Sequence, residues 1–197
     1  MTDPGPSRKL LFATANQHKL AELRAMVPIG IEIVGLDAYP ELPDIIEDGE
    51  TFRANALIKA AALHSYTGIE CLAEDSGLVV PALDGLPGIH SARYAGIHGD
   101  SRANITKLLH QMADITDRSA HFHSCICLLG EDGPSYFEGD CHGTILYKPE
   151  GKDGFGYDPV FQPLGCVQSF ACMSSAEKNL ISHRSKALDA LLVDLLS

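Results

Sequence analysis

Two acidic residues interrupt an apolar segment in the middle of the chain, where a charged side chain needs a physical reason to be present. Glu74 and Asp75 follow residues 71–73, and Ser76 and Gly77 come directly after them. The pattern predicts a buried strand, in which an unpaired carboxylate costs several kcal/mol. Such a group is kept by pairing with a cation, by binding a metal ion, or by lying at a strand end that opens into a cleft.

Adjacent side chains on a regular strand point to opposite faces, so Glu74 and Asp75 can share one site only if the chain bends there. Gly77 permits such a bend. We therefore expect Asp75 and Ser76 to face a polar cleft, with Glu74 the weaker candidate. An ordinary strand followed by an acidic turn remains an equal alternative on this segment alone.

A second candidate site lies where a short strand, a polar turn and a helix start follow one another. The segment consists of Thr14, Ala15, Asn16, Gln17, His18 and Lys19. Backbone N–H groups at a helix start can hold an anion. The helix dipole disfavours a cation there, so Lys19 calls for another explanation. Phosphate binding is one, and a solvent-facing lysine is the other.

The glycine-rich segment 151–159 is poor material for a core and well suited to a ligand-binding loop. Phe155 or Tyr157 could stack on a planar base, which is worth roughly 1–3 kcal/mol. The alternative is a tight turn with its aromatic side chains packed beneath it.

A group of basic side chains follows a predicted capping box formed by Ser174 and Glu177. Lys178, His183 and Arg184 span about a turn and a half of the expected helix and can reach one side of a cleft. Three cationic or potentially cationic groups suit a polyanion, although a solvated helix face would have the same composition.

An acidic loop over residues 37–49 carries Glu47, and such runs of charge are usually solvated. A different pattern lies at residues 120–129, where His121, His123, Cys125 and Cys127 alternate with other residues and share one strand face. These four side chains follow a line with steps of roughly 6–7 Å. Zinc needs four ligands that converge tetrahedrally, so a half-buried sheet face, packed against another subunit, is the favoured interpretation.

The elements that must position these residues alternate between strands and helices, which predicts an α/β protein with one hairpin that makes the sheet mixed. Strands are expected at 9–13, 31–35, 71–80, 120–129, 135–139 and 144–147, and helices at 14–27, 51–65, 101–112 and 175–195.

Length and composition fit a single domain over residues 1–197, or two lobes that share a sheet, after a flexible polar leader at 1–8. The net charge of −11 argues against general nucleic-acid binding. The six cysteines form no CxxC pair, which indicates a reducing compartment. The sequence contains neither an apolar segment typical of a signal peptide nor one long enough to span a bilayer, so we expect a cytoplasmic protein without membrane contact.

Six short motifs occur together and in a fixed order along nearly the whole chain. They are Thr14-x-Asn16-x-x-Lys19, Glu47-Asp48-Gly49-x-Thr51-Phe52, Ala73-Glu74-Asp75-Ser76-Gly77-Leu78, Pro87-Gly88-x-x-Ser91-Ala92-Arg93, Gly154-Phe155-Gly156-Tyr157-Asp158-Pro159 and Glu177-Lys178-Asn179-x-x-Ser182-His183-Arg184. This set resembles the inosine triphosphatase (Ham1-like) family of bacterial non-canonical purine nucleoside triphosphate pyrophosphatases.

The resemblance implies a Mg²⁺-dependent hydrolase that converts ITP, dITP and XTP to the monophosphate and pyrophosphate, and so removes deaminated purines from the nucleotide pool. It also implies a two-lobed α/β fold with an elongated mixed sheet flanked by helices, an active-site cleft between the lobes, and a homodimer.

The resemblance further implies roles for individual residues. Asp75 would accept the proton of the attacking water and, with Glu47, would hold Mg²⁺. His183 and Arg184 would recognise the base. The remaining substrate contacts would come from Thr14, Ala15, Asn16, Gln17, His18, Lys19, Ser76, Phe155, Gly156, Tyr157, Asp158 and Lys178.

Two positions depart from the family pattern. Position 54 is Ala where many relatives have Glu, and position 46 is Ile where some have a second Glu beside Glu47. Metal binding from this loop then depends on Glu47 alone. The alternatives are a phosphatase or pyrophosphatase with other nucleotide substrates, and a non-catalytic nucleotide-binding module. The presence of Lys19, Asp75 and Lys178 beside Glu47 argues against the second.

Overall fold

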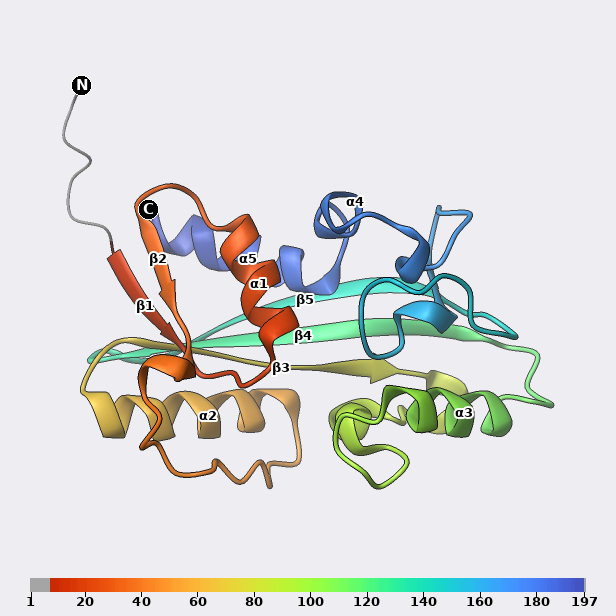
Figure 1. Ribbon diagram of the computed structural model, residues 1–197, viewed down its shortest axis with the longest axis horizontal. Helices are drawn as coiled ribbons and strands as arrows, with labels where there is room; N and C mark the ends of the chain where they lie inside the picture. Colours follow the sequence, from red (N-terminus) through yellow and green to blue (C-terminus); the bar gives the residue numbers. More distant parts are fainter. Residues whose placement is uncertain (1–7, 197) are drawn as a thin grey trace. The chain divides into compact units, whose positions relative to one another are not determined.

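The computed structural model describes residues 8–196, and these form a six-stranded mixed sheet in the order β2-β1-β3-β4-β5-β6 (Figure 1). The strands are β1 Arg8–Phe12, β2 Ile31–Val34, β3 Cys71–Val79, β4 Ser119–Gly130, β5 Gly133–Ile145 and β6 Phe161–Pro163. The helices are α1 Gln17–Met26, α2 Phe52–Thr67, α3 Ser101–Gln111, α4 Ser175–Asn179 and α5 His183–Leu195. Strand β1 pairs in parallel with β2 and β3, whereas β5 and β6 are antiparallel. The predicted α/β class and mixed sheet are confirmed.

The predicted leader at 1–8 lies outside the described residues except for Arg8, which already belongs to β1. By its packing the chain divides into two compact units. The first comprises the described residues up to Asp75, Cys125–Glu138, and the residues from Ala187 onward. The second comprises Ser76–Ser124 and Gly139–Lys186.

The first unit has a three-layer arrangement in which side chains alternate between the two faces of β1 and β3. In Figure 1, α2 runs along one side of β3 and α1 lies on the other. The α2 face holds the cluster of Leu11, Ala13, Ala56, Ala60, Leu63, Cys71 and Ala73. The opposite face holds the cluster of Leu10, Phe12, Leu20, Leu23, Leu72, Leu188 and Leu191. This alternation with a period of two residues decides which helix each later residue of β3 faces.

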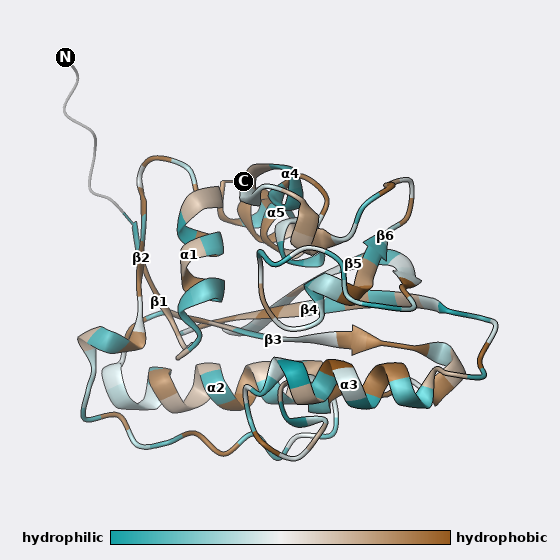
Figure 2. Cartoon of the chain, turned by 45° about the vertical axis from the view of Figure 1, so that its right-hand side comes forward, coloured by the Kyte–Doolittle hydropathy of each residue, from teal (hydrophilic) through white to brown (hydrophobic). Residues whose placement is uncertain are grey.

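The second unit is built around an aromatic core, to which Phe122, Phe161 and Phe170 contribute tilted and edge-on ring pairs. Helix α3 begins at the N-cap Asp100, whose carboxylate accepts a hydrogen bond from the N–H of Ala103 at 2.9 Å. Brown and teal bands alternate along α3 in Figure 2, as expected for a helix with one buried and one exposed face.

The predicted bend at Gly77 is wrong, because β3 continues as one strand from Cys71 to Val79. The expectation that Asp75 and Ser76 face the same way fails with it, since neighbours on a continuous strand point to opposite faces. Glycine permits a bend at position 77, but the residue lies inside the continuous strand β3.

Two element boundaries also differ from the prediction. The strands expected at 135–139 and 144–147 are one strand, β5, because Gly143 has no side chain and lets the backbone of Gln162 in β6 approach it closely. The helix expected at 175–195 is two helices separated by residues 180–182. The Ser182 hydroxyl accepts a hydrogen bond from the N–H of Ser185 at 3.1 Å, which gives α5 its own start.

Candidate functional site

Two predicted metal ligands of the first unit, Glu47 and Asp75, meet at a single ammonium group. The Nζ atom of Lys59 lies 2.6 Å from Oε2 of Glu47 and 3.1 Å from Oδ1 of Asp75. The side chains of Lys59 and Asp75 are about nine-tenths buried, with 10% and 11% of their surface exposed, and Glu47 is 31% exposed. Two carboxylates thus face one point, where a cation already lies.

Strand β3 and helix α2 create this arrangement. Asp75 has the same parity along β3 as Cys71 and Ala73, whose side chains pack against α2. Lys59 lies on the buried face of α2, between the core residues Ala56 and Ala60. A buried lysine opposite a buried aspartate is the ordinary way in which such charges are compensated.

The other oxygen of the Asp75 carboxylate is also held. The Nδ2 atom of Asn55, one turn before Lys59 on α2, donates to Oδ2 of Asp75 at 3.3 Å. The Oδ1 atom of Asn55 accepts a hydrogen bond from the N–H of Gly49 at 2.9 Å. A single buried amide therefore connects Asp75 to the loop that carries Glu47.

The donor set of Glu47 and Asp75 fits Mg²⁺. Carboxylate oxygens are the ligands that Mg²⁺ prefers, and it usually takes one or two of them and leaves its other positions to water and substrate phosphates. The convergence of both carboxylates on the Lys59 ammonium shows that they can surround a cation. These two residues would hold the metal ion.

Glu74 has a different partner. Its carboxylate lies 3.7 Å from the Nζ atom of Lys19, and 1% of its side chain is exposed. Lys19 belongs to α1, which packs on the face of β3 opposite to α2. Adjacent acidic residues thus form ion pairs with lysines from two different helices.

The predicted phosphate-binding segment 14–19 starts α1 with a well-formed cap. The side-chain oxygen of Asn16 accepts hydrogen bonds from the N–H groups of His18 at 2.9 Å and Lys19 at 3.2 Å. The hydroxyl of Thr14 accepts one from the N–H of Asn16 at 3.2 Å. Since the cap occupies the amides of His18 and Lys19, phosphate binding here would depend on the Lys19 side chain rather than on these two N–H groups.

In the second unit the glycine-rich loop is built around a buried ion pair. Oδ2 of Asp158 lies 2.7 Å from Nζ of Lys178, with 3% and 5% of the two side chains exposed. The same oxygen accepts a hydrogen bond from the N–H of Phe155 at 2.9 Å. Gly154 has φ +73°, and a Cβ atom there would collide with the Asp158 carboxylate, so the loop requires glycine at this position.

The two aromatic residues of this loop have different environments. Phe155 is half-buried, and the Nζ atom of Lys178 and the Cζ atom of Arg184 lie 4.7 and 5.7 Å from its ring centroid. Tyr157 is 3% exposed, and its hydroxyl donates to the carbonyl of Ser91 at 3.0 Å. Burial raises the pKa of Tyr157 above its ordinary value. Phe155 is therefore the ring that can stack on a ligand, whereas Tyr157 belongs to the core.

The two residues predicted to recognise a base begin α5. The His183 ring stacks on Phe122, with centroids 4.7 Å apart and an interplanar angle of 12°. Arg184 is 1% exposed, and its Nη2 atom donates to the hydroxyl of Ser76 at 3.4 Å. The structure thus groups Ser76, Phe155 and Arg184 in the second unit, with Lys178 beside the same ring.

Sequence reasoning missed Asn55 and Lys59 as site residues. The helical spacing of residues could have revealed them. The buried face of α2 consists of positions 55, 56, 59, 60 and 63, and two of these residues are polar. A polar pair four residues apart within a buried stripe needs a polar partner across the interface, and Asp75 is that partner for both.

The predicted ladder of histidines and cysteines on β4 is a sheet face with separate local contacts. The ring centroids of His121 and His142 lie 5.2 Å apart, and Nδ1 of His123 lies 2.8 Å from the carboxylate of Asp140. Burial raises the pKa values of Cys125 and Cys127 to about 12 and 11. In residues 8–196, no three His, Cys, Asp or Glu side chains are arranged to hold a metal ion.

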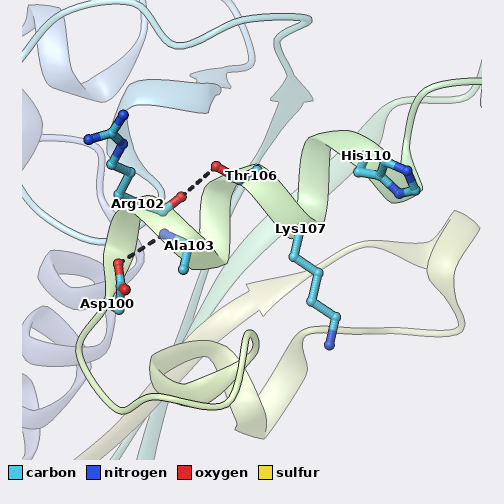
Figure 3. A pocket seen from close by; sticks show the side chains of 6 residues that line it. All are labelled: Asp100, Arg102, Ala103, Thr106, Lys107 and His110. Carbon is cyan, nitrogen blue, oxygen red and sulfur yellow. Dashed lines mark hydrogen bonds between the residues drawn. The ribbon is translucent and has the colours of Figure 1, made fainter.

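A hollow of about 510 Å³ on the outer side of α3 contains none of the predicted site residues (Figure 3). It is lined by Asp100, Arg102, Ala103, Thr106, Lys107 and His110. Two of its polar side chains bond to backbone carbonyls: the Thr106 hydroxyl donates to Arg102 within α3 at 2.8 Å, and the Lys107 ammonium to Tyr94, before the helix, at 2.6 Å. Nothing in its lining matches the chemistry predicted from the motifs.

Comparison with known proteins agrees with the geometry. A family model described as the Ham1 family matches residues 10–194. A protein of Streptomyces coelicolor, named dITP/XTP pyrophosphatase, is 48% identical over 190 residues, which cover 93% of this chain and 95% of that protein.

Solved structures show the same fold. The Ham1 protein of Staphylococcus aureus matches with a TM-score of 0.87 at 36% identity, over 95% of this chain and 98% of that one. A HAM1 protein from Coxiella burnetii matches with a TM-score of 0.88 at 39% identity, over 96% and 98% of the two chains. Within the described residues, no helix is long and apolar enough to cross a membrane.

Proposed function

The chain belongs to the Ham1 family, and on that basis we propose that it hydrolyses ITP, dITP and XTP to the nucleoside monophosphate and pyrophosphate. Names of relatives such as the Streptomyces coelicolor dITP/XTP pyrophosphatase support this substrate class. The observation that carries the chemistry is the convergence of Glu47 and Asp75 on one cation position. The physiological result would be removal of deaminated purine nucleotides.

Hydrolysis of a phosphoanhydride depends on charge neutralisation and in-line positioning more than on covalent chemistry. In this proposal Glu47 and Asp75 would hold Mg²⁺, which would supply neutralising charge for the phosphate oxygens. Lys19, at the start of α1, contributes a further cation to the triphosphate. Lys178 contributes a further substrate contact.

Asp75 accepts the proton of the attacking water as the oxygen of that water bonds to the α-phosphorus and the bond to pyrophosphate breaks. A carboxylate has about four lone-pair positions, so hydrogen bonds from Asn55 and Lys59 leave acceptor capacity on Asp75. Glu74 has no part in this step, because it lies on the opposite face of β3 with Lys19.

The base is recognised by the second unit. Phe155 stacks on the purine, while Arg184 and His183 donate hydrogen bonds to O6 and Ser76 adds a polar contact. ATP carries an amino donor in place of O6, so a donor of the protein would be left unpaired, and such mismatches discriminate strongly. The segment from Gly156 to Asp158 keeps the Phe155 ring in place.

The proposal is tested by measuring pyrophosphate release from ITP, XTP, ATP and GTP with Mg²⁺, using wild type and Asp75→Asn. Rapid release from ITP and XTP, slow release from ATP and GTP, and its loss in the variant are the expected results. Orthophosphate as the first product would indicate a phosphatase. Nucleotide binding without turnover would indicate a binding module.

Two further properties belong to the proposal. The free thiols of the six cysteines suit a reducing, cytoplasmic location. A homodimer is the expected assembly, and light scattering of the purified protein would give a mass of twice 21.1 kDa. We propose no nucleic-acid or membrane partner.

A further inference from the structure

Asn55 has no role among the predicted site residues, yet it contacts both parts of the candidate metal site. We propose that Asn55 is a positioning residue, which orients the Asp75 carboxylate and fixes the loop of Glu47 so that both can bind one divalent cation. This inference rests on the proposed function, in which Glu47 and Asp75 hold Mg²⁺.

Each end of the Asn55 amide has a defined partner. Its Nδ2 donates to Oδ2 of Asp75 at 3.3 Å, and its Oδ1 accepts from the N–H of Gly49 at 2.9 Å. The residue is 1% exposed, so water does not compete with these bonds. Together with the Lys59 ammonium between Glu47 and Asp75, the amide completes a second connection between the loop and the strand.

The loop is shaped to receive this amide. A Cβ atom on Gly49 would lie 2.8 Å from Oδ1 of Asn55 and 2.8 Å from Cβ of Ala54. These distances are too short for real side chains, so the loop passes over the start of α2 with no room for a larger residue. Gly49 and Asn55 are therefore in close van der Waals contact as well as hydrogen-bonded.

The chain offers an internal comparison for the same device. Asn104 occupies the fourth position after the N-cap Asp100 of α3, as Asn55 does after the N-cap Thr51 of α2. Both are buried, and Asn104 likewise accepts a hydrogen bond from a preceding loop, from the N–H of Ala95 at 2.6 Å.

The two asparagines differ in what their amide N–H₂ groups bind. The Nδ2 atom of Asn104 donates to the backbone carbonyls of Ser91 and Ala92, at 3.4 and 3.2 Å. That of Asn55 donates to a carboxylate. Asn104 secures a loop only, whereas Asn55 secures a loop and orients a candidate metal ligand. Groups that orient a metal ligand in this way typically affect metal affinity 10–100-fold when they are removed.

The test measures Mn²⁺ binding without nucleotide, by loss of the free Mn²⁺ signal in electron paramagnetic resonance. Asn55→Ala should raise the Kd for Mn²⁺ about 10–100-fold relative to wild type. Hydrogen exchange at the Gly49 amide should accelerate in the same variant, because its acceptor is gone. Asn104→Ala is the matched control, and it should leave the Kd for Mn²⁺ unchanged while it speeds exchange at Ala95.

Gly49→Ala is a second variant that disturbs the same contact from the loop and leaves the buried face of α2 intact. It should also raise the Kd for Mn²⁺, which keeps the proposal testable if Asn55→Ala fails to fold. A Kd equal to that of wild type in both variants would overturn the assignment of Asn55. If the wild-type protein binds no Mn²⁺ and releases no pyrophosphate from ITP, the proposed function fails as well as the role of Asn55. Failure of the proposed function is therefore seen in the wild type, and failure of the Asn55 assignment only in the variants.

Discussion

Replacement of Lys59 by Met should tighten the binding of a divalent cation, although it removes a well-made ion pair. The Lys59 ammonium lies 3.1 Å from Asp75 and 2.6 Å from Glu47, at the point where both carboxylates converge. A metal ion that binds these carboxylates has to compete with that positive charge. Met keeps most of the length and apolar stem of the lysine, so the side chain at position 59 can still fill its place on the buried face of α2, beside Ala56 and Ala60.

The magnitude follows from Coulomb's law. At 3.1 Å, unit charges attract by about 1 to 5 kcal/mol for effective dielectric constants from 80 down to 20. We use the value of about 1 kcal/mol, because the Glu47 side chain is 31% exposed and water screens its attraction to Lys59. Since 1.4 kcal/mol corresponds to a factor of about ten, loss of the competing charge should lower the Kd for Mn²⁺ by at least about fivefold.

The assay is a titration of nucleotide-free protein with Mn²⁺ at pH 8, in wild type and Lys59→Met. Arg53→Met is the matched control, because Arg53 lies on the same helix and pairs with the exposed Glu138 at 2.8 Å, away from Asp75. The control should bind Mn²⁺ as wild type does. Weaker Mn²⁺ binding by Lys59→Met would refute the reasoning, since it would mean that the lysine supports the metal site rather than competing for it.

Two other predictions concern stability and thiol reactivity. Lys178→Met should lower the free energy of unfolding in urea by about 3–5 kcal/mol, because it removes one partner of a buried ion pair and leaves the Asp158 charge in the core. The double variant with Asp158→Asn should recover part of this loss. A loss below about 1 kcal/mol in the single variant would contradict the buried geometry. Iodoacetamide at pH 8 should label Cys172 and Cys166 in the native protein, whereas the four buried cysteines, with pKa values raised to about 11 or 12 by burial, should react only after unfolding. Mass spectrometry counts the labels, and fast labelling of any buried cysteine would contradict that prediction.

Much of the fold was predictable because the hydrophobic period and the helix caps are local signals. The expected start of α3 at Asp100 is confirmed by the cap hydrogen bond to Ala103, and the capping box of Ser174 and Glu177 is confirmed in α4. Alternation along residues 120–129 correctly predicted a strand with two faces. Such signals depend on neighbours two to four positions away, so they can be read without knowledge of the tertiary structure.

The features that the sequence did not predict depend on contacts with distant parts of the chain. Two strands were expected at 135–139 and 144–147, and only the close passage of β6 at Gly143 shows how one continuous β5 accommodates its neighbour. Asn55 and Lys59 looked like ordinary polar positions of a helix, because nothing near them in sequence reveals that Asp75 faces them across the helix–sheet contact. The motifs pointed to Glu47 and Asp75, and the residues that contact these two carboxylates became visible only in the structure.

The adjacent carboxylates of β3 illustrate how one residue of offset separates two functions. Glu74 and Asp75 point to opposite faces, so Glu74 meets Lys19 from α1 while Asp75 meets Lys59 from α2. A second carboxylate on the α2 face therefore comes from another part of the chain, and Glu47 lies there, 2.6 Å from the Lys59 ammonium. In the proposed site that ligand is Glu47, whose loop is held by the hydrogen bond from the Gly49 N–H to the Asn55 amide. Glu74 has its own partner, because its buried carboxylate forms an ion pair with Lys19, the residue proposed to contact the triphosphate.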